Sequence, residues 1–525
     1  MSSAEIIIVG SGAAGVAAAY QLRDRDVLVL DVGFRPEPDS LSGNLYDLRK
    51  TRRDLLADLL GSDFEGLHNV FNAYLSPKLK NPHMRFVTRD WQTLSPIVAE
   101  NFDAVMSFAM GGLANAWGAG VYRYNDDDLR GFPIKAHDLD PYFDALTKKV
   151  GVSGRADALE PFFGSSQGLL PPLQLDRMGR AILGRYEKKT RELANRGLFI
   201  GRPRVAVLSQ DHDGRSGYGY EALEFFKPHV PAIYTPAFTL TEMVCKREVR
   251  YAPGHLVTGF QETPSGVTAF ATQLSTGNKV VFSCRKLILA AGALNSAKIV
   301  LGSEHDFERT LPLLDNAVSY IPLVDPSKIG ASQESRFFSG VSLNAVYSGP
   351  LHQEPVQMSI YGMSGTLRSD FLFDFPLSVR ANIAAAKFLT PAMVIVQLFY
   401  PDDPRPGNCM QLLPSGALKL KYEPRACVRI ERHLVRAFRL LGLLGSHRLC
   451  RYLAPGNSFH YAGALPMREN PEGQYETDRY GRLNEKQHVY IADAASFPRL
   501  PSKNYTFAMM ANAMRIADRV RGSLA

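Results

Sequence analysis

The strongest constraint on the fold lies in the first thirty-one residues, where a glycine-rich turn joins an apolar run to a helical pattern. Residues 6–9 are apolar and β-branched, which is typical of a buried parallel strand, and residues 16–22 are strong helix formers. Between them, Gly10, Gly12 and Gly15 follow the spacing G-x-G-x-x-G. These glycines permit a tight turn, a close backbone approach to a pyrophosphate and close packing of the helix on the strand. The pattern predicts a parallel α/β nucleotide-binding unit.

A second apolar run, residues 27–30, ends at Asp31. A carboxylate at this position can accept hydrogen bonds from both hydroxyls of an adenosine ribose, and the phosphates would lie at the helix N-terminus. We therefore predict a dinucleotide site in which Ala13 and Ala14 complete the phosphate turn. The alternative is a glycine-rich turn in an ordinary α/β domain.

Length and charge limit the remaining possibilities. A chain of 525 residues is too long for one core, so we expect two domains. A net charge of +8 could favour an anionic substrate, nucleic acid or a lipid surface. The basic residues are dispersed, and we interpret the densest clusters, at 50–53 and 246–247, as solvated faces. We predict no nucleic-acid partner.

The cysteines and the first residues of the chain indicate the cellular compartment that we expect for the protein. The five cysteines are an odd number without a C-x-x-C pair, which indicates neither a disulfide framework nor a zinc site, and we predict no metal. The first strand begins too close to Met1 for a signal peptide, and no apolar run is long enough to span a membrane. We expect a cytoplasmic protein.

Two internal segments are rich in small residues. Residues 108–120 contain four glycines and four alanines, so this stretch can pass close to a flat ligand. Among its side chains, Asn115 offers a polar group and Trp117 a large aromatic ring. The alternative is a close-packed turn with a core tryptophan. Residues 286–296 are a predicted buried strand that ends in small residues, which suits a second approach to the same dinucleotide.

The last block returns to nucleotide-binding patterns. His460 lies among small residues, and residues 489–492 are a predicted buried strand that ends at Asp493. Residues 504–506 then precede a long helix over 507–520, whose N-terminus could also meet the ligand. We expect this block to rejoin the nucleotide domain.

The pattern between these motifs is mixed. We predict helices that begin at 139 and 177, a meander of strands over 240–249, 266–273 and 279–282, and strands over 356–361 and 393–400. Residues 378–388 are apolar and alanine-rich, and we interpret them as a core helix rather than a membrane-surface helix.

The ordered motifs resemble those of the glucose-methanol-choline (GMC) flavin oxidoreductases. They are Gly111-Gly112 through Trp117-Gly118, residues 289–296, residues 459–463, and residues 493–498 followed by 504–506. The resemblance implies an α/β fold in which a discontinuous Rossmann-like FAD-binding domain carries an inserted α+β substrate-binding domain. We assign 1–135, 232–310 and 455–525 to the FAD-binding domain, and 136–231 and 311–454 to the substrate domain.

The resemblance also implies roles for individual residues. Gly10, Gly12 and Gly15 would hold the pyrophosphate, Asp31 the ribose, and the backbone of Val244, on a strand, the adenine. Gly111, Gly112 and Asn115 would lie along the isoalloxazine and ribityl chain, and Asp493 near the ribityl chain and the pyrophosphate. Further cofactor contacts are expected at Ala13, Ala14, Ala116, Ala291, Gly292, Ala494, Asn504, Tyr505 and Thr506. Members with covalent flavin carry histidine at the position of Ala116, so we expect non-covalent FAD.

The implied reaction is oxidation of the CH–OH group of an alcohol or sugar-like substrate, with hydride transfer to flavin N5. His460 matches the catalytic base and Asn504 the residue that orients the hydroxyl. Two other interpretations stay open: a lyase that keeps FAD on the same fold, and a non-catalytic flavoprotein at a membrane surface. The basic charge would suit an anionic substrate, and the electron acceptor is left open.

Overall fold

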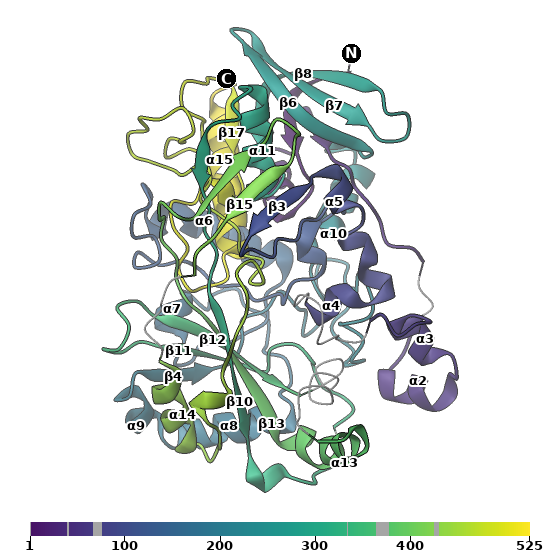
Figure 1. Ribbon diagram of the computed structural model, residues 1–525, viewed down its shortest axis with the longest axis vertical. Coiled ribbons are helices and arrows are strands. Elements are labelled where there is room, and N and C mark those ends of the chain that lie inside the picture. Colours follow the sequence, from purple (N-terminus) through teal and green to yellow (C-terminus); the bar gives the residue numbers. More distant parts are fainter. Residues whose placement is uncertain are drawn as a thin grey trace.

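The computed structural model describes residues 2–38, 41–66, 76–332, 334–363, 377–424 and 430–524. Figure 1 shows two sheet-based halves, with the two chain ends close together beside the nucleotide-type sheet and a second large sheet at the opposite end of the molecule. The fold is α/β, and its Rossmann-like domain is discontinuous.

The parallel part of the first sheet has the order β5-β2-β1-β8, and β17 also pairs with β8. Its strands are β1 (Ser2–Val9), β2 (Val27–Leu30), β5 (Arg250–Ala252), β8 (Lys279–Leu289) and β17 (Val489–Ile491). The predicted strands over 6–9, 27–30 and 489–492 are confirmed. Three distant parts of the sequence therefore build one sheet, because each supplies a short apolar run that must be buried on both faces.

Strand β8 combines two of the predicted runs. Its first half pairs with β7 (Gly266–Gln273), which pairs in turn with β6 (His255–Thr263), while its last three residues pair with β17. The meander is therefore real, but its members are β6, β7 and β8.

The predicted strand over 240–249 is wrong. Helix α10 (Pro236–Cys245) occupies this stretch, with proline in its first turn. Its buried residues Ala237, Leu240 and Met243 recur at helical spacing and pack in the same core as helix α1. The apparent alternation came from the polar residues of the exposed side.

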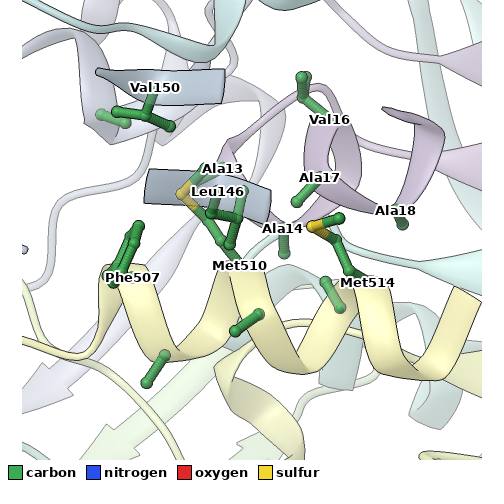
Figure 2. Close-up of a cluster of buried hydrophobic side chains, with 14 of the residues drawn as sticks. Ala13, Ala14, Val16, Ala17, Ala18, Leu146, Val150, Phe507, Met510 and Met514 are labelled. Atoms are coloured by element: carbon green, nitrogen blue, oxygen red, sulfur yellow. The ribbon is translucent and has the colours of Figure 1, made fainter. Parts of the chain in front are cut away.

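Three helices pack with one face of the first sheet in a single core. They are α1 (Ala13–Gln21), α6 (Ala136–Val150) and α15 (Thr506–Gly522). Figure 2 shows Met510 and Met514 of α15 beside the alanines of α1, whereas Phe507 lies nearer Val150 of α6 and stacks on Phe143 of that helix. Because alanine is small, the larger side chains of α15 fill the space between the helices.

The second large sheet is antiparallel, with the order β16-β10-β13-β12-β11-β4. Alternate residues of its strands, such as Ile321 and Val394, pack with helices on one face. The strands are β4 (Leu198–Gly201), β10 (Val318–Val324), β11 (Leu343–Tyr347), β12 (Val356–Gly362), β13 (Met393–Phe399) and β16 (Arg451–Tyr452); the helices are α8 (Arg177–Glu187), α9 (Thr190–Ala194) and α14 (Glu431–Arg439). The predicted strands over 356–361 and 393–400 are confirmed.

A small sheet connects the halves. Its order is β3 (Ile97–Glu100), β15 (Leu418–Lys421), β14 (Cys409–Leu412) and β9 (Thr310–Pro312). It thus combines segments that we assigned to different domains, and the domain boundaries stay predictions. The remaining elements are α2 (Leu45–Thr51), α3 (Leu55–Leu60), α4 (Pro77–Lys80), η1 (Pro82–Val87), α5 (Trp91–Leu94), η2 (Gly112–Asn115), α7 (Glu160–Phe163), α11 (Ala293–Ser303), η3 (Pro326–Lys328), α13 (Val379–Leu389), η4 (Thr390–Ala392), η5 (His447–Leu449) and η6 (Ala494–Ser496).

Helix α13 forms where an apolar helix was expected, but the core-helix interpretation is wrong. Val379, Ile383 and Phe388 are 66%, 44% and 59% exposed. The helix buries Asn382 and rests on small residues instead, because Ala385 and Ala386 lie against the sheet. Within the described ranges, the helices lack the combination of length and hydropathy that a membrane span requires.

Candidate functional site

A cavity of about 1210 Å³ lies between the two large sheets. Pockets that hold a drug-sized ligand usually measure roughly 300–1,000 Å³, so this space suits a larger ligand or two ligands together. Its walls combine the glycine turn, residues 105–120, the C-terminal end of β8 and the last block with the inner face of the six-stranded sheet.

The glycine turn has the geometry that its sequence predicts. Gly10 has φ +99° and lies against the backbone of Ala290, and a Cβ on Gly15 would come within 2.0 Å of the Gly10 carbonyl oxygen. Gly12 differs, because a Cβ there would meet no atom within 4 Å. Gly10 and Gly15 therefore shape the turn, while Gly12 leaves open space in the wall of the cavity, which it lines.

Three helix N-termini open into this cavity. The residues before α1, α11 and α15 are Gly12, Gly292 and Tyr505, and the side chain of none of them caps its helix. All three line the cavity, as do Ala13, Ala14, Ala291 and Thr506. Uncapped backbone N–H groups and the positive ends of the helix dipoles favour a ligand with negative charge or with several acceptor oxygens.

Asp31 lies at the end of β2 and lines the same cavity. It accepts a short hydrogen bond from the Ser11 hydroxyl and one of 3.3 Å from Tyr251. Burial raises the pKa of Asp31 to about 7. The carboxylate is thus positioned beside the glycine turn, where a ribose hydroxyl could add a further hydrogen bond and favour its charged form.

Asp493 lines the cavity with its neighbour Ala494, but its carboxylate is already engaged. One oxygen accepts from the Gly292 N–H at 2.9 Å and the Ser296 hydroxyl at 2.6 Å, and the other accepts from the Ala495 N–H at 2.9 Å. Its side chain therefore holds together the start of α11 and the turn after β17.

The small-residue segment 108–120 passes along the cavity as predicted, with Gly112, Ala116 and Trp117 in its wall. A Cβ on Gly112 would lie 3.2 Å from the Gly12 Cα, so the two glycine turns meet. Gly111 and Asn115 lie behind this wall. The Asn115 amide donates to the carbonyls of Met110 and Gly112, and its oxygen accepts from Thr235. Asn115 thus supports the segment from behind.

Val244 cannot play the role expected of it as a strand residue. It lies in α10, is 37% exposed and is outside the cavity wall. Residues 255–258 of β6 line the cavity instead, and the N–H of His255 donates to the Asp31 carbonyl at 2.9 Å. Sequence reasoning missed this strand, although the apolar run that follows Gly254 was a usable signal.

Two lysines of the cavity were also missed. Lys78 is buried and Lys298 is half-buried, and burial lowers the pKa of each to about 8. Lys298 lies on α11 and donates to the Ser95 hydroxyl at 3.0 Å. Isolated lysines in a sequence carry no signal of this kind, because only the fold brings them to the cavity.

His460 lines the cavity and is 8% exposed. Its ring stacks on Phe399 at 5.2 Å and contacts Tyr505 at 5.1 Å. Burial lowers the pKa of His460 to about 4. The imidazole is therefore neutral at pH 7 and able to accept a proton.

Asn316 determines which ring nitrogen of His460 is free. The Asn316 amide nitrogen donates to the carbonyls of Tyr400 at 2.8 Å and Pro501 at 3.0 Å, so its oxygen must face His460 Nδ1, which lies 2.8 Å away. Because an amide oxygen can only accept, Nδ1 carries the proton. The lone pair of the ring is then on Nε2, and His460 is presented as a base.

The loop that carries His460 is anchored by Asp315. Its carboxylate accepts from the Gly456 N–H at 2.7 Å and, in a short hydrogen bond, from the Ser458 hydroxyl, whose oxygen accepts from the His460 N–H at 2.8 Å. Burial raises the pKa of Asp315 to about 7. Asp315 and Asn316 are adjacent in sequence, so one segment fixes both the backbone and the ring of the histidine.

Asn504 is held at the same end of the cavity. Its N–H donates to the Gln357 side-chain oxygen at 3.0 Å, and Gln357 pairs in the sheet with Phe399, which stacks on His460. The Asn504 Oδ1 is buried and has no hydrogen-bond partner among the described residues. A ligand hydroxyl at this point could satisfy it, since an unpaired buried acceptor is costly.

We predict that Asn316→Ala lowers kcat about 10- to 100-fold, because a displaced base loses its alignment with the substrate. The carbonyls of Tyr400 and Pro501 would also lose a donor, so a lower Tm is expected as well. Stopped-flow reduction of the cofactor would separate the two effects. Equal rates in Asn316→Ala and the unaltered protein would show that the hydrogen bond does not position His460.

No family model matches the chain. Paromamine 6'-oxidase of Streptomyces fradiae is 24% identical over 547 residues, which span 99% of this chain and 92% of that protein. Pyridoxine 4-oxidase from Mesorbium loti has the same fold, with a TM-score of 0.59 at 14% identity over 99% of both chains. A formate oxidase of Aspergillus oryzae RIB40, studied for its FAD modification, also matches with a TM-score of 0.59 at 14% identity, over 99% of this chain and 98% of that one.

These matches cover nearly the full length of each protein. Together with the sequence motifs, they support a place for the chain among the glucose-methanol-choline oxidoreductases, whose fold it shares.

Proposed function

We propose that this protein is an FAD-dependent oxidoreductase that oxidises the CH–OH group of an alcohol, with His460 as the base. The observation that carries the proposal is the Nε2 lone pair of a neutral, buried histidine in the cavity that also holds the dinucleotide-type turn. That the relatives named above are oxidases supports the same reaction class.

The residues present fit FAD. The open space at Gly12 and the uncapped starts of α1, α11 and α15 suit a diphosphate and ring acceptor atoms, and Asp31 suits the ribose. Residues 255–258, which adjoin Asp31, would take the adenosine end in place of Val244. Ala116 supports non-covalent attachment, because its side chain offers no atom for a bond to the flavin.

Alcohol oxidation removes a proton from oxygen and a hydride, with two electrons, from carbon. When bound, FAD supplies the acceptor for the hydride. His460 Nε2 takes the hydroxyl proton, and Nδ1–H stays bonded to Asn316, so the protonated ring keeps its position. Asn504 orients the hydroxyl, and the product is the corresponding carbonyl compound.

The test is the absorption spectrum of the purified protein, followed anaerobically as alcohols are added. We expect a flavin band that an alcohol substrate bleaches. A flavin band that disappears from the protein on denaturation and filtration would support non-covalent FAD.

The same titration separates the alternatives. A stable flavin band during cleavage of a hydroxynitrile would favour the lyase. A flavin band that no alcohol, sugar or hydroxynitrile affects would favour a non-catalytic flavoprotein, and the absence of flavin after reconstitution would overturn the proposal.

A further inference from the structure

The inner face of the six-stranded sheet forms a long wall of the cavity. Residues that alternate along β10 and β13 face the cavity, and the sheet register places them in rows across the two strands. The rows pair Tyr320 with Gln397, Pro322 with Ile395, and Val324 with Met393. Tyr361 of β12 extends the second row.

This wall has a catalytic end and an outer end. Phe399 at the end of β13 stacks on His460, whereas Met393 at its start lies six residues away, a distance of about 20 Å along an extended strand. At the outer end the Leu444 N–H donates to the Val324 carbonyl at 2.7 Å. Leu444 and Leu449 line the cavity there and are 53% and 61% exposed, so this end opens to solvent.

The two outer rows of the wall consist mainly of apolar side chains, those of Pro322, Val324, Met393 and Ile395. The polar groups of its first row bond to each other, because Gln397 Nε2 donates to the Tyr320 hydroxyl at 3.1 Å. One charged residue that lines the cavity, Arg451, pairs with Tyr320 from the edge strand β16 and is itself exposed. Sugar hydroxyls laid against the apolar side chains of the two outer rows would be buried without partners, which is costly, whereas a hydrocarbon would gain from burial there.

The opening has apolar edges as well. Met363 and Met393, which line the cavity, pack against Ala385, Ala386 and Leu389 of α13. The exposed face of α13 then continues the apolar surface outward through Val379, Ile383 and Phe388. Figure 1 shows α13 at the end of the molecule opposite the nucleotide-type sheet. Among the described residues, apolar side chains therefore run without a break from the cavity lining at Met363 and Met393 to the exposed face of α13.

We propose that the substrate is an alcohol with an extended hydrocarbon body, whose hydroxyl meets His460 and Asn504 while its chain lies along β10 and β13 toward Leu444 and Leu449. This inference rests on the proposed alcohol oxidation. It departs from the anionic, sugar-like substrate that the charge balance suggests, because the wall next to the base offers few unpaired polar groups.

The test is a series of primary alcohols from 1-butanol to 1-decanol, with kcat/KM measured for each. We expect kcat/KM to rise about threefold to fourfold per methylene, as burial of each CH₂ in an apolar site predicts. A flat or falling series, or a preference for glucose or an aminosugar over 1-decanol, would overturn the inference.

A variant at the opening keeps the test independent of folding in the core. Leu449→Glu places a charge where the chain would leave the wall, so the ratio of kcat/KM for 1-decanol to that for 1-butanol should fall about tenfold. Val98→Glu is the matched control, because Val98 is 53% exposed on β3, outside the cavity wall. If the 1-decanol to 1-butanol ratio of kcat/KM is unchanged in Leu449→Glu, the hydrocarbon chain does not leave the cavity past Leu449.

Binding without turnover distinguishes the two proposals. In His460→Ala, 1-decanol should raise Tm through binding to the folded state, whereas glucose should not. If no alcohol bleaches the flavin of the unaltered protein, the proposed function fails. If short alcohols bleach it but 1-decanol neither reacts better nor raises Tm, the substrate class alone fails.

Discussion

Replacement of His460 by alanine should lower kcat about 10²- to 10⁴-fold and leave FAD bound, because the variant loses the proposed general base but keeps the glycine turn and the helix N-termini. The His460 side chain is buried against Phe399 and Tyr505, so its removal should also lower the stability of the folded protein modestly. The main effect is expected on the rate of the chemical step. Anaerobic stopped-flow reduction of the flavin measures this step directly.

His137→Ala is the matched control, because His137 is 80% exposed and lies in α6. We expect this variant to reduce its flavin at the rate of the unaltered protein. Near-normal reduction in His460→Ala would refute the role of the histidine.

The pH profile gives the same residue a second readout. Burial lowers the pKa of His460 to about 4, so the neutral base dominates above that pH and is lost as pH falls through it. In the unaltered protein, kcat/KM should therefore be constant through neutral pH and fall tenfold per unit below about pH 4. The acid limb should be absent from His460→Ala.

The sequence was most informative where function requires particular residue types. The glycine spacing with Asp31, the buried run over 286–296 and the strand before Asp493 predicted three separated segments of one nucleotide domain, and these segments do share a sheet. His460 and Asn504 do meet at one end of the cavity. Their positions followed from motifs in the last block of the chain.

Other parts depended on tertiary contacts that a local pattern does not contain. Asn316, which orients His460, lies 144 positions away in the chain, and nothing around it signals this contact. Residues 236–245 form a helix because they pack on α1, which overrides their apparent alternation. The exposure of α13 likewise depends on the sheet beneath it.

Gly12→Ala and Gly15→Ala should fail in different ways, and the pair tests the proposed cofactor site. Gly12 has φ −68°, which any residue can adopt, and a Cβ there meets no protein atom within 4 Å, so the variant should fold normally. Its methyl group would occupy the space proposed for the diphosphate, and FAD affinity should fall at least about tenfold, the change that accompanies loss of one or two hydrogen bonds.

In Gly15→Ala the methyl group would come within 2.0 Å of the Gly10 carbonyl oxygen, so α1 must move from β1. Overpacking of this kind typically costs about 1–3 kcal/mol. We therefore expect Gly15→Ala to lower the stability of the apoprotein as well as FAD binding, measured by chemical unfolding and by flavin titration. Normal FAD affinity in Gly12→Ala would contradict the site, because the open space at Gly12 would then have no ligand to fill it.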